Sequence, residues 1–424
     1  MEGIDMSSRV FVVSCLLAVL VFAFSRTAKA EEIFVLPPPD PAAPIPWNLD
    51  ELYKVPQTYP APEFEKDAPA GITPLFFKNE DYLGKETRAF AWVGIPEGEG
   101  PFPAMVLVHG GGGAAFKEWV QLWMDRGYAA IAMDTAGQIP IRPEGQTKGW
   151  LRHDHSGPKG WGDFLSADKP KEDQWFYHAE AAVIRAHSLL RSYPQVDTNR
   201  VGITGISWGG MLTCVTAGVD DRFKLAVPVY GCGFLGEDSF WLSQFFRSMG
   251  REKTMRWLSL WDPSRYVGRA KIPMLFVNGT NDKHFRPGSW QKTYRLVQGD
   301  VSLAYRIRMS HGHEVGWAPE EIYTFADSIF KEGKPLTKIT GQGRDGQTAW
   351  VTCESPVQVV KAELTFTVDS GEWPKHFWQK IDVPVDSGAS RIEAVVPADA
   401  TAYYFNVYDS RDLISSSEME ELTP

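Results

Sequence analysis

The sequence predicts an α/β protein with a doubly wound, mostly parallel sheet, followed by a small C-terminal β-sandwich. Two patterns predict this fold. Short, almost unbroken apolar runs alternate with stretches that carry apolar residues at helical spacing, which is typical of buried parallel strands connected by helices. Residues 340–424 instead contain strand-like runs separated by turn residues, with no helical period, and this pattern is typical of a sandwich.

The first 30 residues predict a secretory signal peptide. Arg9 precedes the apolar run 10–24, and "AKA" at 28–30 supplies the small residues of a cleavage site, so we expect cleavage after Ala30. An uncleaved anchor is the alternative, and it is less favoured because the run is shorter than the ~20 apolar residues that span a bilayer. We therefore expect a secreted or periplasmic protein without stable membrane association after cleavage.

Three further segments follow. Residues 31–71 are rich in proline, which predicts an extended arm. The α/β domain is expected over 72–335, and its predicted strands are the apolar runs 104–108, 129–133, 201–204, 225–231 and 274–279. Glycines and charges cluster at 333–346, so we place the boundary there and the sandwich over 340–424.

The composition limits the partners of the protein. The 424 residues are 43% hydrophobic, enough to bury a full core, and the formal net charge is −10. This charge argues against a nucleic-acid partner, which would require a basic face. Cys214, Cys232 and Cys353 remain after cleavage, and we expect small buried residues, with a Cys214–Cys232 disulfide as an open alternative.

The stretch "GISWG" at 205–209 places Ser207 between two glycines, after an apolar run and before a helical stretch. This context is typical of the sharp strand-to-helix turn that exposes a nucleophilic serine. A serine hydroxyl needs a general base, and the base needs an orienting acid, which follow in the order serine, acid, histidine. Asp282 in "NGTND" and the histidines of "SHGHEVGW", His311 and His313, stand in that order.

Several alternatives accompany this set. Asp300 and Glu314 are the other acids at a suitable place in the chain. An oxyanion hole needs two backbone N–H donors, of which Trp208, the residue after the serine, supplies one. The second is expected from "HGGGGAA" at 109–115, with Gly111 best placed and Gly112 next, while His109 is expected to be structural.

Together these motifs resemble the α/β-hydrolase superfamily, and more narrowly its branch of secreted acetyl (xylan) esterases, dienelactone hydrolases and prolyl-oligopeptidase-like enzymes. The resemblance covers residues 72–333 and rests on "HGGGG", "VDTNRVGITGISWGG", "NGTND" and "HGHEVGW". It implies Ser207 as nucleophile and Asp282 as acid. It implies His313 as base, because members of the family tend to carry a glycine just before the catalytic histidine, and His311 stays the alternative. It also implies Gly111 and Trp208 as oxyanion donors.

The activity that the resemblance implies is hydrolysis of carboxylic esters through an acyl-enzyme, with no metal or organic cofactor. Export and aromatic-rich loops favour an acetylated carbohydrate or another small ester as substrate, and Trp150, Trp161 and Trp175 are the candidate contacts. A serine peptidase of the prolyl-oligopeptidase type is the alternative, although the chain has no propeller-sized N-terminal domain. A catalytically silent binding module is a third hypothesis, and the oligomeric state stays open.

Overall fold

A computed structural model describes residues 32–160, 164–385 and 391–422. Residues 33–424 form one compact unit. In the described ranges, no helix has both the length and the apolar character needed to cross a membrane. The predicted signal peptide and Trp161 lie outside the described residues.

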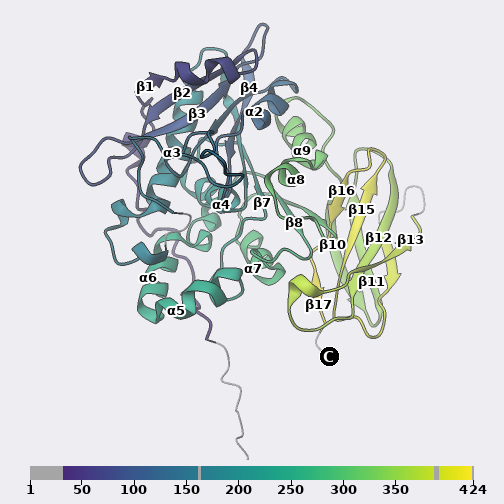
Figure 1. The fold of residues 1–424 in the computed structure, drawn as a ribbon. Helices are drawn as coiled ribbons and strands as arrows, with labels where there is room; N and C mark the ends of the chain where they lie inside the picture. The colour runs from purple at the N-terminus through teal and green to yellow at the C-terminus, as the bar shows by residue number, and fades with distance from the viewer. Residues whose placement is uncertain (1–31, 161–163, 386–390, 423–424) are drawn as a thin grey trace, which may run out of the picture. The chain divides into compact units, whose positions relative to one another are not determined.

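A nine-stranded mixed sheet forms the centre of this unit (Figure 1). Its order is β1-β2-β3-β5-β4-β6-β7-β8-β9. From β5 through β4 to β9 all neighbours are parallel, whereas β1, β2 and β3 pair antiparallel. The strands are β1 (Thr58–Pro60), β2 (Ile72–Lys78), β3 (Arg88–Gly94), β4 (Phe102–Val108), β5 (Ala129–Met133), β6 (Val196–Ile206), β7 (Leu225–Val229), β8 (Met274–Gly279) and β9 (Val301–Arg306).

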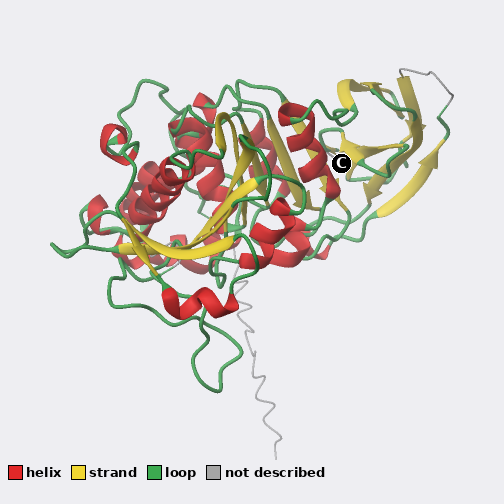
Figure 2. Ribbon diagram, turned by 90° about the horizontal axis from the view of Figure 1, so that it is seen from above, coloured by secondary structure: helices red, strands yellow, loops and turns green. Residues whose placement is uncertain are grey.

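Helices lie on both sides of this sheet (Figure 2). The strands β5 and β7 are buried along their whole length, which explains their unbroken apolar sequence. The predicted α/β fold class is therefore confirmed. The main helices are α2 (Lys117–Met124), α3 (Trp175–Leu190), α4 (Trp208–Val219), α6 (Arg251–Trp261), α7 (Pro287–Tyr294), α8 (His313–Trp317) and α9 (Glu320–Phe330), with shorter α1 (Leu49–Leu52) and α5 (Arg247–Met249).

The proline-rich segment before β2 is more ordered than an extended arm. It contains α1, a 3₁₀ turn and β1, and β1 pairs antiparallel with the edge strand β2. Phe34, Trp47 and Phe64 are buried, and the indole N–H of Trp47 donates a hydrogen bond to the carbonyl of Tyr177. These large aromatic side chains attach the segment to the core in spite of its proline content.

The C-terminal residues form two antiparallel sheets with a core of their own, as the sandwich prediction requires. One sheet has the order β10-β11-β14, and the other has the order β13-β12-β15-β16, with β17 paired to β15. Ser416 of this part accepts a hydrogen bond from the backbone N–H of Tyr305 in β9, so the sandwich contacts the main sheet directly. The strands are β10 (Lys338–Asp345), β11 (Thr348–Glu354), β12 (Val359–Thr367), β13 (Gln379–Val383), β14 (Arg391–Val395), β15 (Ala402–Asp409), β16 (Ile414–Ser416) and β17 (Glu420–Glu421).

The three cysteines Cys214, Cys232 and Cys353 are buried free thiols, so the alternative of a Cys214–Cys232 disulfide is not realised.

Candidate active site

Ser207 occupies a strained turn between β6 and α4. Its backbone has φ 60° and ψ −117°, a conformation that costs a non-glycine residue free energy and is found mainly at functional sites. A Cβ atom on Gly209 would lie 1.9 Å from the carbonyl oxygen of Val108, and one on Gly205 would lie 2.2 Å from that of Gly209. Both flanking positions therefore require glycine, which explains the "GISWG" sequence.

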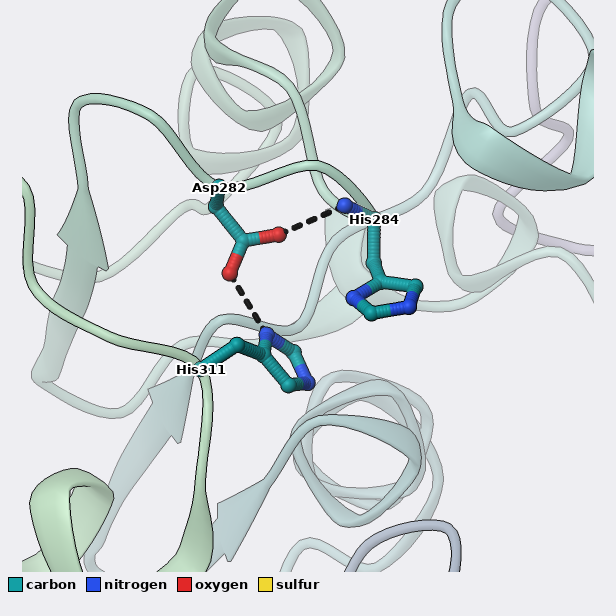
Figure 3. Close-up of side chains that lie close together, drawn as sticks. All are labelled: Asp282, His284 and His311. Carbon is teal, nitrogen blue, oxygen red and sulfur yellow. Dashed lines mark hydrogen bonds and ion pairs between the residues drawn. The ribbon is translucent and has the colours of Figure 1, made fainter. Parts of the chain in front are cut away.

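His311 and Asp282 complete a hydrogen-bonded chain with this serine. The Nε2 atom of His311 lies 2.9 Å from Ser207 Oγ. Its Nδ1 atom lies 2.6 Å from Asp282 Oδ2, and Figure 3 shows this second hydrogen bond. Because an ionised carboxylate only accepts hydrogen bonds, Nδ1 carries the proton and Nε2 is free to accept the serine proton. This arrangement is the one that general-base activation of a serine hydroxyl requires.

The acid is held in place by the loop that follows β8. Asp282 Oδ1 accepts two backbone hydrogen bonds of 2.8 Å, from the N–H groups of His284 and Phe285. The Asp282 side chain is fully buried, whereas that of His311 is 20% exposed. The carboxylate therefore has a fixed orientation, and substrate has access to the imidazole.

The structure corrects the choice of base. His313, which the sequence favoured, begins helix α8, and its Nε2 atom accepts a hydrogen bond of 3.0 Å from the backbone N–H of Gly110. Its ring packs on Phe116, with ring centroids 4.9 Å apart, and burial lowers the pKa of His313 to about 4. His311, the alternative, is the histidine that reaches both Ser207 and Asp282.

The glycine that favoured His313 has no steric role. Gly312 has an extended backbone with φ −175°, and a Cβ atom there would meet open space. The other acids that the sequence allowed lie elsewhere: Asp300 pairs with Lys338, and Glu314 is exposed in the first turn of α8.

The glycine-rich loop after β4 lies directly against the nucleophile. A Cβ atom on Gly110 would lie 2.8 Å from the Cβ atom of Ser207. The N–H of Gly110 already donates to His313, and that of Gly113 donates to the carbonyl of Gly110. These two amides are therefore engaged, and Gly111, with Gly112 as the alternative, stays the predicted second oxyanion donor beside Trp208.

Two side chains hold this loop from outside. His109 is 1% exposed, and its Nε2 atom accepts a hydrogen bond from the N–H of Thr135, so its Nδ1–H donates to the carbonyl of Gly110. The indole N–H of Trp150 donates to the carbonyl of Gly112 at 2.9 Å. His109 thus has the structural role that the sequence suggested.

The candidate substrate-contacting tryptophans differ in their surroundings. Trp150 is half-buried and lines a cavity of about 420 Å³ together with Phe116 and Ile141. Trp175 is 1% exposed, donates its indole N–H to the carbonyl of Thr135 and packs edge-on against Trp208. The prediction that Trp175 contacts substrate is therefore wrong, because its side chain is part of the core.

Sequence reasoning missed the aromatic groups that surround His311. The ring centroid of His284 lies 4.5 Å from that of His311, and burial lowers the pKa of His284 to about 4. The ring centroid of Tyr230 lies at 4.6 Å, and its hydroxyl donates to the carbonyl of Ser310. Two features of the sequence could have identified these residues. His284 stands two residues after the acid, and Tyr230 stands at the end of a strand-like run.

Asp282, His284 and His311 also offer the donor types of a metal site. One ligand atom of each lies within 4.8 Å of the others. Figure 3 shows the three side chains side by side. A metal ion on Nδ1 of His311 would displace the proton of the 2.6 Å hydrogen bond to Asp282. The observed hydrogen bond between His311 Nδ1 and Asp282 fits a proton-transfer chain.

Comparisons with known proteins identify the family of this chain. The sequence model of the acetyl xylan esterase (AXE1) family matches residues 80–328. Acetyl esterase Axe7A of Xylanibacter ruminicola is 22% identical over 260 residues, which cover 59% of this chain and 58% of that protein. The uncharacterized peptidase YuxL of Bacillus subtilis is 27% identical over 203 residues, or 44% of this chain and 27% of that protein. The matched region thus spans little more than half of Axe7A and about a quarter of YuxL.

Solved structures share the fold. The acetyl xylan esterase from Paenibacillus sp. R4 superposes with a TM-score of 0.51 at 21% identity, covering 66% of this chain and 92% of that one. Acetyl xylan esterase 1 from Thermoanaerobacterium sp. JW/SL YS485 gives 0.52 at 18% identity, covering 68% and 95%. These likenesses confirm the α/β-hydrolase fold.

Proposed function

Because this chain belongs to the acetyl xylan esterase family, we propose that it is a serine esterase that removes acetyl groups from carbohydrate through an acyl-enzyme. Family membership makes the protein a hydrolase of the esterase kind. The observation that carries the serine mechanism is the hydrogen-bonded chain from Ser207 Oγ through His311 to Asp282.

In the first half of the reaction, Nε2 of His311 takes the Ser207 proton while the serine oxygen attacks the ester carbonyl. The carboxylate of Asp282 stabilises the imidazolium that forms, without itself taking the proton. When the tetrahedral intermediate collapses, the bond between the acyl carbon and the sugar oxygen breaks, and His311 donates its proton to that departing oxygen.

In the second half, His311 removes a proton from a water molecule, and the hydroxide equivalent attacks the acyl-serine. Collapse of the second intermediate releases the carboxylic acid and returns the proton to Ser207. The backbone N–H groups of Gly111 and Trp208 are the proposed donors to the oxyanion in both intermediates. Each such donor typically lowers the barrier by about 3 to 4 kcal/mol.

Export is part of the proposal. The Arg9, apolar-run and "AKA" pattern in the first 30 residues supports a cleaved signal peptide, and an enzyme acting on polysaccharide has to meet its substrate outside the cytoplasm. N-terminal sequencing of the protein recovered from the medium or periplasm is expected to begin at Glu31.

Ester and amide substrates test the proposed activity. We expect acetate release from acetylated xylan and hydrolysis of 4-nitrophenyl acetate, both abolished by Ser207→Ala, with no cleavage of an aminoacyl-prolyl anilide. Cleavage of the anilide would favour the peptidase alternative, which the resemblance to YuxL supports. We expect Ser207→Ala to fold, because the backbone contacts of the turn do not depend on the hydroxyl. Circular dichroism of the variant checks this.

A further inference from the structure

A segment of the C-terminal sandwich lies beside the catalytic acid. The connection between β12 and β13 contains a 3₁₀ turn at Trp373–Lys375. The side-chain amide of Asn281, the residue before Asp282, donates hydrogen bonds to the carbonyl oxygens of Pro374 (3.1 Å) and His376 (2.8 Å). The loop that carries the acid is therefore bound directly to residues 373–378.

The two chain segments enclose a cleft of about 600 Å³. Asp282 and His311 form part of its lining, so the cleft opens next to the base that contacts Ser207. Its size suits one or two sugar rings. Its position suits the alcohol part of an ester, which extends away from the acyl group. The cleft is lined further by Lys283, Arg308, Lys375 and Phe377.

The cleft combines cations with an exposed aromatic ring. Phe377 is 58% exposed, and the guanidinium carbon of Arg308 lies 4.5 Å from its ring centroid. Among the described residues, the ion pairs at this cleft are Glu372 with Lys375 and Asp282 with His311, so the exposed Lys283 and Arg308 are unpaired. Two free cations in one cleft of a chain with a net charge of −10 indicate an anionic ligand.

In the part of the chain that the structure describes, the other titratable groups at the cleft form no ion pair with Lys283 or Arg308. Asp369 accepts a hydrogen bond from the backbone N–H of Phe377, and Glu372 is paired with Lys375. Burial lowers the pKa of His376, which is therefore neutral near pH 7. Asp282 is buried beneath His311, and its oxygens are occupied by hydrogen bonds.

We infer that this cleft, the Arg308–Phe377 subsite, binds a carboxylate-bearing sugar, a uronate, adjacent to the acetylated residue of the substrate. An aromatic ring stacks on the apolar face of a sugar, and a guanidinium and an ammonium group bind a carboxylate. The inference rests on the proposed function, because it assigns the sugar that flanks the reacting ester. It makes Arg308, Lys283 and Phe377 specificity-determining residues contributed by both parts of the chain.

The test compares two acetylated xylo-oligosaccharides that differ only in a glucuronic acid branch. We expect a higher kcat/KM for the acidic oligosaccharide, with a preference that declines at high salt because the cations are exposed. Arg308→Gln and Lys283→Gln are expected to reduce the ratio of acidic to neutral kcat/KM by up to about fivefold each. Lys54→Gln, which removes an exposed cation just after the C-terminus of α1, is the control and should leave the ratio unchanged.

The outcomes separate this inference from the proposed function. If Ser207-dependent hydrolysis of 4-nitrophenyl acetate occurs but the acidic branch brings no preference, or if Arg308→Gln leaves the ratio unchanged, the subsite is refuted and the esterase stands. If no ester is hydrolysed, calorimetry decides: the branched oligosaccharide should bind Ser207→Ala, and more weakly when Arg308→Gln is added. Absence of that binding overturns the subsite independently of catalysis.

Discussion

Replacement of either histidine in "SHGH" by alanine distinguishes the base from a positioning residue. His311 contacts both Ser207 and Asp282, so His311→Ala removes the proton acceptor for the nucleophile. General-base catalysis typically contributes 10²- to 10⁴-fold, and removal of a triad member costs up to about 10⁶-fold in kcat. We therefore expect His311→Ala to lower kcat by at least about 10³-fold.

His313→Ala has a different and smaller predicted effect. It leaves the N–H of Gly110 without the acceptor it now has at 3.0 Å, in a partly buried position. An unsatisfied buried donor costs about 1 to 3 kcal/mol. If the glycine loop adds this whole cost to the activation free energy, kcat falls by about 5- to 150-fold. His313→Gln, whose carbonyl oxygen accepts a hydrogen bond from the same N–H, should recover part of that loss.

The assay is steady-state hydrolysis of 4-nitrophenyl acetate at pH 8 by the protein and the three variants, with Ser207→Ala as the background. Thermal unfolding of each variant is measured in parallel, so that loss of fold is not mistaken for loss of catalysis. A larger loss of kcat in His313→Ala than in His311→Ala, with both variants folded, would refute the assignment of roles.

Gly209, His313 and Asp282 each give one further prediction. Gly209→Ala should lower the free energy of unfolding by several kcal/mol in urea titrations, because its Cβ would lie 1.9 Å from the Val108 carbonyl oxygen, while Gly288→Ala, with open space, should be tolerated. Burial lowers the pKa of His313 from 6.5 to about 4, so the unfolded chain binds more protons between these values. The melting temperature should therefore fall as the pH drops from 6.5 to 4, and His313→Gln should flatten that slope. Prolonged dialysis against a chelator should leave the hydrolysis rate unchanged, whereas a loss that zinc restores would contradict the hydrogen-bonded assignment of Asp282.

Local sequence signals sufficed for much of the fold and for the strained turn at Ser207. The apolar run 129–133 coincides with β5, and the run 274–279 coincides with β8, because both strands are buried on both faces. The glycines beside Ser207 are needed by the close backbone approach of the turn itself, so the motif is readable without tertiary information.

Other features depend on contacts that no local pattern encodes. Helix α8 begins at His313, two residues after His311. This start determines which of the two histidines faces Ser207. The sequence predicts Trp175 in a loop over the site, but it is the first residue of the buried helix α3. The contact between Asn281 and His376 joins positions 95 residues apart, and only the docked sandwich brings them together.

Covalent labelling of Ser207 shows whether this serine is the nucleophile of an esterase. The protein is treated with a fluorophosphonate, digested and analysed by mass spectrometry, while acetate release from acetylated xylan is followed in the same sample. We expect one adduct on the peptide that contains Ser207, loss of acetate release in proportion to labelling, and neither adduct nor release in Ser207→Ala. Acetate release that persists in fully labelled protein or in Ser207→Ala would contradict it.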